Sequence, residues 1–416
     1  MTSLLPEASG ALWTRKLFWS CVAMVLWGYT VAHYIHGAFG YRGYGDFFLL
    51  MRSVREWLAG GRLDVGFSYL HPPFFYLLNI PLALLRDPLT VQIMVVVNQL
   101  LLVACMGLLS AAMSPKPPWR LWGWLLLPLA LNFRPLLYLL SMAKIELLQV
   151  VLLLGTFVSF QRNRPWIAGG LMAFSGMVKP LPLILVLYWA WKRQWRVVGG
   201  WTLATAFIVA ICSAVIGAKI VWTYFMDVAL PHGGSASSLY WYENQSLLGV
   251  AGRLFHRVRP QQFFIDPNKV TSPEVLFGWG LRLVVLIWLG YLIRPRGSVS
   301  QARLLGEWSI SLAGMLLLSP FSRDYYAVFL VPSYIFLAYY LWLRDLHWSS
   351  GGFWLGVVSY MLVGQGFPLG VIHRLPSVIP GVPNFQAYFH YGVPMVGYLL
   401  LVAAWARALR EGERGV

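Results

Sequence analysis

Apolar runs follow one another along the whole chain, and many reach the roughly 20 residues that a membrane-spanning helix needs. The strands of a membrane β-barrel would instead appear as short segments of alternating hydrophobicity, and these runs do not alternate. The pattern therefore predicts an all-α, polytopic integral membrane protein with a single transmembrane domain over residues 1–416. Counting the runs predicts about 12 spans, an even number that leaves both ends of the chain in the cytoplasm.

The N-terminal run sets the orientation of the predicted spans. Arg15 and Lys16 precede Leu17–Ile35, which lacks a signal-peptide cleavage pattern and is expected to be retained as the first helix. Basic residues before a first span favour a cytoplasmic N-terminus. Residues 37–72 then form the first outer loop.

The next spans are expected over residues 72–86, returning to the inside near Arg86, and over residues 89–113. The path of residues 116–146 stays open after that. Lys116 and Arg120 favour a cytoplasmic loop, whereas the count of spans puts them outside.

In the second half of the chain a helical hairpin is expected to turn at Lys179, on the outer side. A span over Val197–Gly217 then opens a long outer loop, residues 218–273. The Ser319–Tyr326 turn faces the same side, and a basic tail, residues 407–416, lies in the cytoplasm.

Composition agrees with a membrane protein, because only 11% of the residues are charged and 58% are hydrophobic. Soluble domains carry roughly 25% charged residues. The net charge of +17 would suit nucleic acid, but the cations cluster at the ends of the apolar runs. That placement fits the positive-inside rule and contacts to lipid phosphates, so membrane lipids are expected partners and nucleic acid is not.

Asp46 is the most informative acidic residue. It lies among glycines and tyrosines just before Phe47–Ala59, where apolar residues recur at steps of three and four, as in a helix lying in the membrane interface. Acidic groups at a membrane are expensive and tend to be kept for function. The alternative is that Asp46 caps that helix.

A set of polar groups is predicted to share the outer face with Asp46. It comprises His71, Lys179, Glu243, Asn244, Gln245, Arg253, Arg323 and Asp324. A carboxylate with cations nearby suits transfer from an anionic donor, since it can accept a proton while arginine and lysine bind the departing phosphate.

Each of these residues also has a structural alternative. His71 could begin a helix, Lys179 could reach along the membrane interface, and Arg253 and Arg323 could contact lipid headgroups. Lys144 and Glu146 could form a structural pair near the interface, although at this spacing they do not face each other on a helix. No carboxylate motif accompanies the histidines, so no metal and no other cofactor is expected.

Several motifs, in order, resemble the GT-C glycosyltransferases and, within them, glycosyltransferase family 87, typified by polyprenol-phosphate-mannose-dependent mannosyltransferases of phosphatidylinositol mannoside synthesis. Asp46 takes the place of the family's aspartate. The other matching stretches are Gly60-Gly61 with Tyr69-Leu-His-Pro-Pro73, Lys179-Pro-Leu-Pro182, Asn244-Gln-Ser-Leu247 with Arg253, and Ser319-Pro-Phe-Ser322.

The resemblance implies an inverting, metal-independent transfer on the outer face of the cell membrane, with Asp46 as general base. The donor would be a polyprenyl-phosphate sugar, mannose first, and the acceptor a lipid or glycan. The implied phosphate-binding residues are Lys179, Arg253, Arg323 and His71. The implied substrate-binding residues are Tyr44, Glu243, Asn244, Gln245, Lys144, Glu146 and Tyr325.

The chain departs from the family pattern at two places. It reads Arg323-Asp-Tyr325 where the family often has a histidine, and Ala143-Lys-Ile-Glu146 where it often has Gly-Gln-x-Asn. Both departures bear on the sugar and acceptor more than on the reaction. Two other functions stay open: a transporter or flippase of lipid-linked sugars, and a polysaccharide polymerase or ligase.

Overall fold

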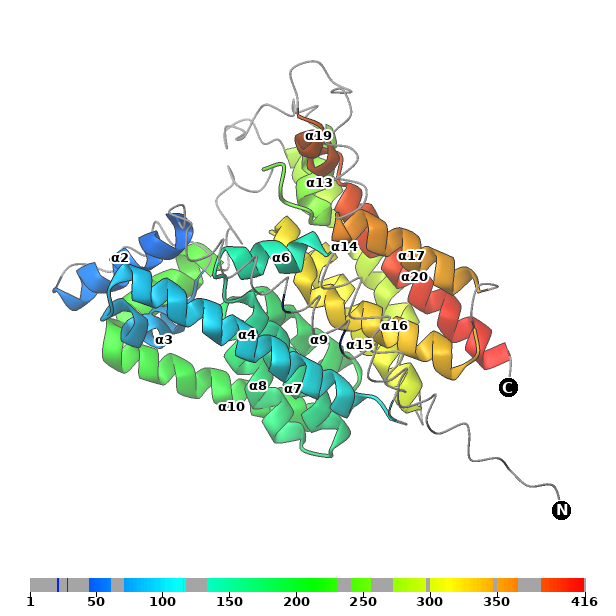
Figure 1. Cartoon of the computed structure of the whole chain (residues 1–416), viewed down its shortest axis with the longest axis horizontal. Helices are drawn as coiled ribbons and strands as arrows, with labels where there is room; N and C mark the ends of the chain where they lie inside the picture. The colour runs from blue at the N-terminus through cyan, green and yellow to red at the C-terminus, as the bar shows by residue number, and fades with distance from the viewer. Residues whose placement is uncertain are drawn as a thin grey trace.

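The computed structural model describes residues 21, 28, 45–60, 71–114, 116, 133–229, 241–255, 272–296, 300–346, 350–365 and 383–414. Within these ranges the chain is helical and forms no β-strand, which confirms the all-α prediction for this part of the molecule (Figure 1). Nearly all of the predicted first span, Leu17–Ile35, lies outside the described residues.

The helices, in chain order, are α2 (Gly45–Leu58), α3 (Pro73–Ala83), α4 (Asp87–Ala112), α6 (Arg134–Ser141), α7 (Glu146–Gln161), α8 (Pro165–Val178), η1 (Leu181–Ile184), α9 (Leu185–Trp191), α10 (Trp195–Cys212), η2 (Ser213–Gly217), α11 (Ala218–Thr223), η3 (Tyr224–Ala229), α13 (Leu247–Phe255), α14 (Ser272–Leu292), α15 (Gln301–Leu318), η5 (Asp324–Leu330), α16 (Val331–Leu343), α17 (Gly351–Gly364), α19 (Asn384–His390) and α20 (Val393–Arg414).

Four described helical runs are long and apolar enough to cross a membrane: Asp87–Ala112, Trp195–Met226, Asp324–Leu343 and Val393–Glu413. Shorter apolar helices, among them α7, α8 and α17, pack beside them. Large apolar side chains such as Leu203, Phe207 and Ile287 are more than 60% exposed on the outside of the bundle. Such a surface is expected where lipid rather than water surrounds the helices, so the chain is a membrane protein. The count of about 12 spans stays a prediction.

Hydrogen bonds between helix ends define two ends of the bundle. Gln161, at the end of α7, and Gln301, at the start of α15, both donate to the carbonyl of Ala112, at 3.2 and 3.3 Å. We call this the Gln161 end. The opposite end holds the start of α7, the end of α8 and the end of α15, and we call it the Lys179 end.

The core of the bundle is built around α15. Nearly all of its residues from Leu305 to Leu317 are buried on every side, which is expected only of a helix enclosed by others. It packs against α14, α16 and α20, and its ring contacts include Trp308 stacked on Phe157 of α7 at 5.7 Å. This central helix ends at Leu318, so the Ser319–Ser322 turn that follows it lies at the Lys179 end.

Glycines let α8 and α10 approach closely. A side chain at Gly169 would put its Cβ 2.2 Å from the carbonyl oxygen of Val197, and one at Gly200 would put it 2.6 Å from the carbonyl oxygen of Trp166. Any larger residue would force the two helices apart. This close packing fixes α8, which carries Lys179 at its C-terminal end.

The predicted helix after Asp46 is present as α2. Its apolar positions Leu50, Met51 and Val54 are buried against Phe75 and other residues of α3, while Arg52 is exposed. The helix begins at Gly45, so Asp46 is its second residue rather than the cap that precedes it. Whether α2 lies in the membrane interface stays a prediction.

The predicted second span, residues 72–86, is corrected by the structure. Helix α3 has 11 residues, about 16 Å of helix, which is too short to cross. Arg55 of α2 donates to the carbonyls of Ala83 and Leu85 and pairs with Asp87 at 2.6 Å, so this segment stays beside α2.

The orientation of α4 resolves part of the open path after residue 113. Asn98, near its middle, donates to the carbonyl of Lys144 at the Lys179 end, at 3.1 Å. Asp87 therefore lies on that side of the bundle and Ala112 on the other. The sequence predicts residues 86–88 and Arg162 on the same side, but the structure puts them at opposite ends of the bundle. Lys116 comes shortly after Ala112, at the same end as Arg162.

Two further boundaries differ from the prediction. The helical run begun by α10 continues through η2, α11 and η3 to Ala229, past the expected end at Gly217, although the backbone departs from helical geometry there with a φ of 112°. The expected tail from Arg407 is not a separate segment, because Arg407–Arg414 forms the last turns of α20. By contrast, the hairpin predicted at Lys179 is confirmed, since α8 ends at Val178 and η1 starts at Leu181.

Candidate functional site

Two of the motif segments are joined by the side chain of Asn244. Its Oδ1 accepts hydrogen bonds from the backbone N–H groups of Ser246 and Ser322, at 3.1 and 2.8 Å, and its Nδ2 donates to the carbonyl of Pro320 at 3.1 Å. Asn244 also forms an isolated antiparallel bridge with Arg323. The Asn-Gln-Ser-Leu and Ser-Pro-Phe-Ser segments are thus one unit, which we call the Asn244 latch.

The residues after Asn244 extend the latch to α13 and α19. Gln245 donates through Nε2 to the carbonyls of Tyr242 and Phe389, at 2.8 and 2.9 Å. Ser246 donates to the Pro320 carbonyl and accepts from the N–H of Gly249, so it caps the first turn of α13. All three polar side chains are buried, and their contacts are structural.

Arg253 is committed to the same frame. Its guanidinium, only 1% exposed, donates to four backbone carbonyls: those of His390, Trp241, Asn244 and Phe389. A guanidinium with these partners holds the 241–244 segment against α19 rather than presenting a free fork to a ligand. The expected phosphate contact of Arg253 therefore finds no geometric support here.

Lys179 lies at the end of α8 and forms a buried ion pair with Glu146, the first residue of α7, at 2.6 Å. Gln149, one turn further along α7, donates to the carbonyls of Ser175 and Lys179, at 2.8 and 3.1 Å. The backbone at the hairpin is thereby fixed, and the ammonium is positioned by its carboxylate partner.

Three cations from different parts of the chain lie close to the Tyr325 ring. The Nζ of Lys144 lies 5.1 Å from its centroid, the Nζ of Lys179 5.6 Å, and the Cζ of Arg323 5.3 Å. These distances are typical of cation–π contacts. Residues far apart in the sequence therefore meet at one ring.

Lys144 owes its position to an unusual backbone at the preceding residue. Ala143 has a φ of 49°, a left-handed conformation that glycine adopts at little cost and alanine does not. The family that the chain resembles in sequence often has glycine at this position. Alanine therefore holds a conformation here that glycine would adopt at a lower cost.

Arg323 forms an ion pair with Glu243 and lies over the Trp241 ring, 4.2 Å from its centroid. Its Nε is buried without a hydrogen-bond partner among the described residues. Asp324 and Arg134 are near enough for their charges to interact. The cations of this site are thus accompanied by nearly as many carboxylates.

His71 lies beside Lys179 and stacks on Phe75, with the ring centroids 4.1 Å apart. Burial, helped by the charge of Lys179, lowers the pKa of His71 to about 3. The ring is therefore neutral at physiological pH. Its Nδ1 has no hydrogen-bond partner among the described residues, so His71 can offer a neutral polar contact but no positive charge.

The start of α2 lies next to this cluster. Phe47, which follows Asp46, packs against a buried cluster that contains Ala143 and against another that contains Val178. The start of α2 therefore shares apolar clusters with residues that neighbour Lys144 and Lys179 in the chain. The Asp46 side chain and all of Tyr44 lie outside the described atoms.

An apolar groove of about 300 Å³ begins directly after the latch. Its walls come from α13, α14 and the start of α20, and include Leu247, Val250, Phe277 and Met395. Leu254 and Phe277 are half exposed at its rim. The groove is open on the side of the bundle that presents apolar side chains.

The structure thus brings together His71, Lys144, Glu146, Lys179, Glu243, Arg323 and Tyr325, and assigns Asn244, Gln245 and Arg253 to the frame around them. Sequence reasoning missed Gln149, Trp241 and Arg134. Gln149 could have been noticed as a polar residue within an apolar run, one turn after Glu146, whereas nothing local marks the other two.

The chain matches the model of a known protein family. The model of glycosyltransferase family 87 matches residues 69–320, more than half of the chain. No curated protein and no solved structure matches. Asp46 precedes the matched range, and Arg323 and Tyr325 follow it.

Proposed function

Because the chain belongs to glycosyltransferase family 87 and is therefore a membrane glycosyltransferase, we propose that it transfers a sugar, mannose first, from a polyprenyl phosphate to a hydroxyl of a lipid or glycan. The observation that carries the proposal is the meeting of Lys144, Lys179 and Arg323 at the Tyr325 ring. A phosphate leaving group needs cations where its charge develops.

The ion pairs explain how these cations are held before the donor arrives. Glu146 holds Lys179 and Glu243 holds Arg323 in place of the phosphate. An entering donor phosphate would compete with the carboxylates for the same donors, and the planar fork of Arg323 suits two phosphate oxygens. We assign Arg253 to positioning, since its donors are used by carbonyls.

The lipid part of the donor is proposed to occupy the apolar groove beside α13. It starts one residue after Ser246 of the latch and is lined by apolar side chains such as Val250 and Leu281. A nucleotide sugar would find no partner for its base and ribose in such a groove, whereas a polyprenyl chain would bury its apolar surface there.

The proposed reaction is a single displacement. The Asp46 carboxylate accepts the proton of the acceptor hydroxyl, and that oxygen forms a bond to the anomeric carbon of the sugar. The bond from this carbon to the phosphate oxygen breaks, and its electron pair leaves with the polyprenyl phosphate. One displacement inverts the anomeric centre, and the cations stabilise the departing charge.

The donor assignment is tested with the purified protein in proteoliposomes that contain one polyprenyl-phosphate sugar at a time, or a nucleotide sugar. We expect transfer only from polyprenyl-phosphate donors. Arg323→Gln should raise the donor KM, whereas Arg162→Gln, an exposed arginine at the Gln161 end, should not. Transfer from the nucleotide sugar, or an Arg323→Gln variant with unchanged donor KM, would contradict the proposal.

A further inference from the structure

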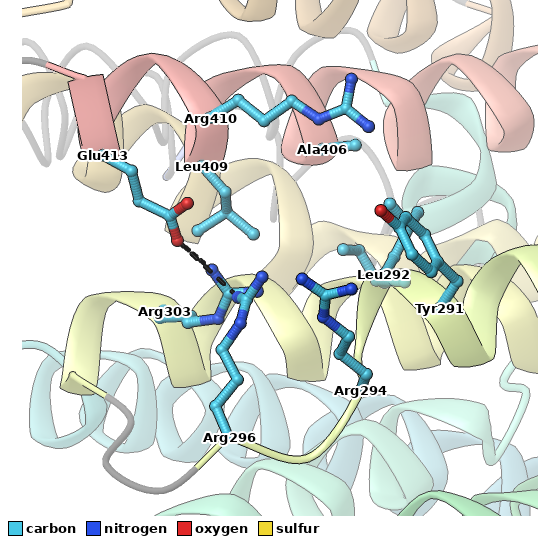
Figure 2. Close-up of a pocket in the computed structure, with 10 residues that line it drawn as sticks. Tyr291, Leu292, Arg294, Arg296, Arg303, Ala406, Leu409, Arg410 and Glu413 are labelled. Atoms are coloured by element: carbon cyan, nitrogen blue, oxygen red, sulfur yellow. Dashed lines mark hydrogen bonds and ion pairs between the residues drawn. The ribbon is translucent and has the colours of Figure 1, made fainter.

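A second charged pocket lies at the Gln161 end, away from the site just described (Figure 2). It is formed by the end of α14, the link that follows, the start of α15 and the last turns of α20. The charged and polar side chains that enclose its cavity of about 70 Å³ are Tyr291, Arg294, Arg296, Arg303, Arg410 and Glu413.

The pocket has an excess of positive charge. Four arginines face one glutamate, a net charge of +3. Arg303 is bound by Glu413 and by Glu307, and Glu307 also pairs with Lys192 at 2.8 Å. The acids near the pocket are therefore already occupied by these partners.

The other arginines of the pocket have guanidinium N–H groups that no carboxylate of the described residues occupies. Arg294 lies over the Tyr291 ring, 5.0 Å from its centroid, and Arg296 only approaches Glu413 at 3.7 Å. Within the described part of the chain neither Arg294 nor Arg410 forms an ion pair. Figure 2 shows the guanidinium groups of Arg294 and Arg296, which rise from below, beside that of Arg303, while the Arg410 side chain extends along α20 above them.

The place of the pocket along the bundle suits a lipid headgroup. Helix α15 has 18 residues, about 27 Å, and runs from this pocket to the Ser319 turn of the site. A hydrocarbon core is about 30 Å thick, so the pocket lies where headgroups of the opposite leaflet are expected. The adjoining face of α14 exposes Ile287 and Tyr291, which acyl chains can cover.

We propose that this pocket binds the phosphate of an anionic phospholipid headgroup and thereby ties the ends of α14, α15 and α20 together. Arginine forks bind phosphate oxygens in pairs, which explains why arginine and not lysine lines the cavity. The positive-inside rule alone explains basic residues at this end, but it does not require four of them from three separate segments to line one cavity.

The test measures melting temperature in detergent after adding phosphatidylglycerol, phosphatidylcholine or inorganic phosphate, together with bound lipid by native mass spectrometry. Phosphatidylglycerol should raise the melting temperature most. In Arg294→Gln/Arg410→Gln the rise should fall by about half, because two of the four arginines are removed. The control Arg162→Gln/Arg164→Gln removes two exposed arginines near the same end and should respond like the parent.

Three results would overturn the proposal: an equal rise for the double variant, an equal rise with phosphatidylcholine, or the full rise with inorganic phosphate alone, which would assign the pocket to a soluble phosphate compound. Should the double variant not fold, Arg410→Gln alone gives the same comparison, since Arg410 is an exposed residue near the end of α20.

Discussion

The ion pair between Lys179 and Glu146 reduces the net positive charge of the candidate site. Sequence reasoning found both residues, but it could not find the pairing, because they come from different helices 33 positions apart. A buried ion pair is costly to break from one side, by about 3–5 kcal/mol, since the remaining charge is left without a partner. The charge of the Lys179 ammonium is thus already balanced by Glu146, and a phosphate would compete with that carboxylate for it.

Glu146→Gln tests this exchange. The variant should be less stable than the parent in the absence of donor, because Lys179 loses its partner. Donor should then stabilise the variant more than it stabilises the parent, since the phosphate no longer competes with a carboxylate. The measurement is the melting temperature of both proteins with and without a polyprenyl-phosphate sugar, and equal donor-induced rises would show that Lys179 does not bind the phosphate.

His71 predicts a defined pH dependence of stability. Its pKa is lowered from 6.5 to about 3 by burial and by the charge of Lys179. Below pH 6.5 the unfolded chain binds a proton at this ring that the folded chain does not, so the contribution to stability is full above pH 6.5 and is lost as the pH falls toward 3.

The comparison is made with His71→Gln, which cannot titrate. Between about pH 7.5 and about pH 5 the parent should lose more of its melting temperature than the variant does. Parallel losses in the two proteins would mean that the pKa of the imidazole is the same in the folded and the unfolded chain.

At the scale of the structural elements, the Asn244 latch shows that the sequence reveals the motifs but not the contacts between them. The motifs Asn244-Gln-Ser-Leu247 and Ser319-Pro-Phe-Ser322 were found from sequence, but their contact was not, because 78 positions separate Asn244 from Ser322. Arg253 was assigned to the phosphate because arginine suits phosphate. Its burial among carbonyls is a tertiary fact that residue type does not reveal.

Asn244→Ala should loosen the latch. It leaves the backbone N–H groups of Ser246 and Ser322 without their acceptor, and a buried unpaired group costs about 1–3 kcal/mol. We expect a lower melting temperature and a lower rate of transfer per folded molecule, because the Arg323 segment is displaced.

The matched control is Gln161→Ala, which removes a hydrogen bond to Ala112 at the opposite end of the bundle. It should lower stability without lowering the rate per folded molecule. If the two variants lose transfer to the same degree, the latch has no special part in the site.

At the scale of the whole molecule, the sequence predicts the helix bundle but not the path of the chain through its first helices. Hydrophobic runs predict α4 and α20 well, because length and polarity alone mark them. They mislead at α3, an apolar helix of 11 residues that begins at Pro73. Apolar packing and the contacts of Arg55 keep this helix beside α2. Counting α3 as a span reversed the expected sides of the residues around it.

The corrected path predicts which side of the membrane each end of α4 faces. In a variant whose three native cysteines are replaced, Asp87→Cys should react with an impermeant maleimide added outside intact cells. Lys116→Cys should react only after the membrane is opened. Labelling of both positions from the outside would contradict the assigned direction of α4.

The central claim is that Asp46 is the base of a transfer from a polyprenyl-phosphate donor, and the most direct measurement is transfer by Asp46→Asn in proteoliposomes. The substitution keeps the size of the side chain and removes its ability to accept a proton. We expect a loss of about 10²–10⁴ in rate, with an unchanged melting temperature and undiminished donor binding. Transfer at the parental rate would contradict the account.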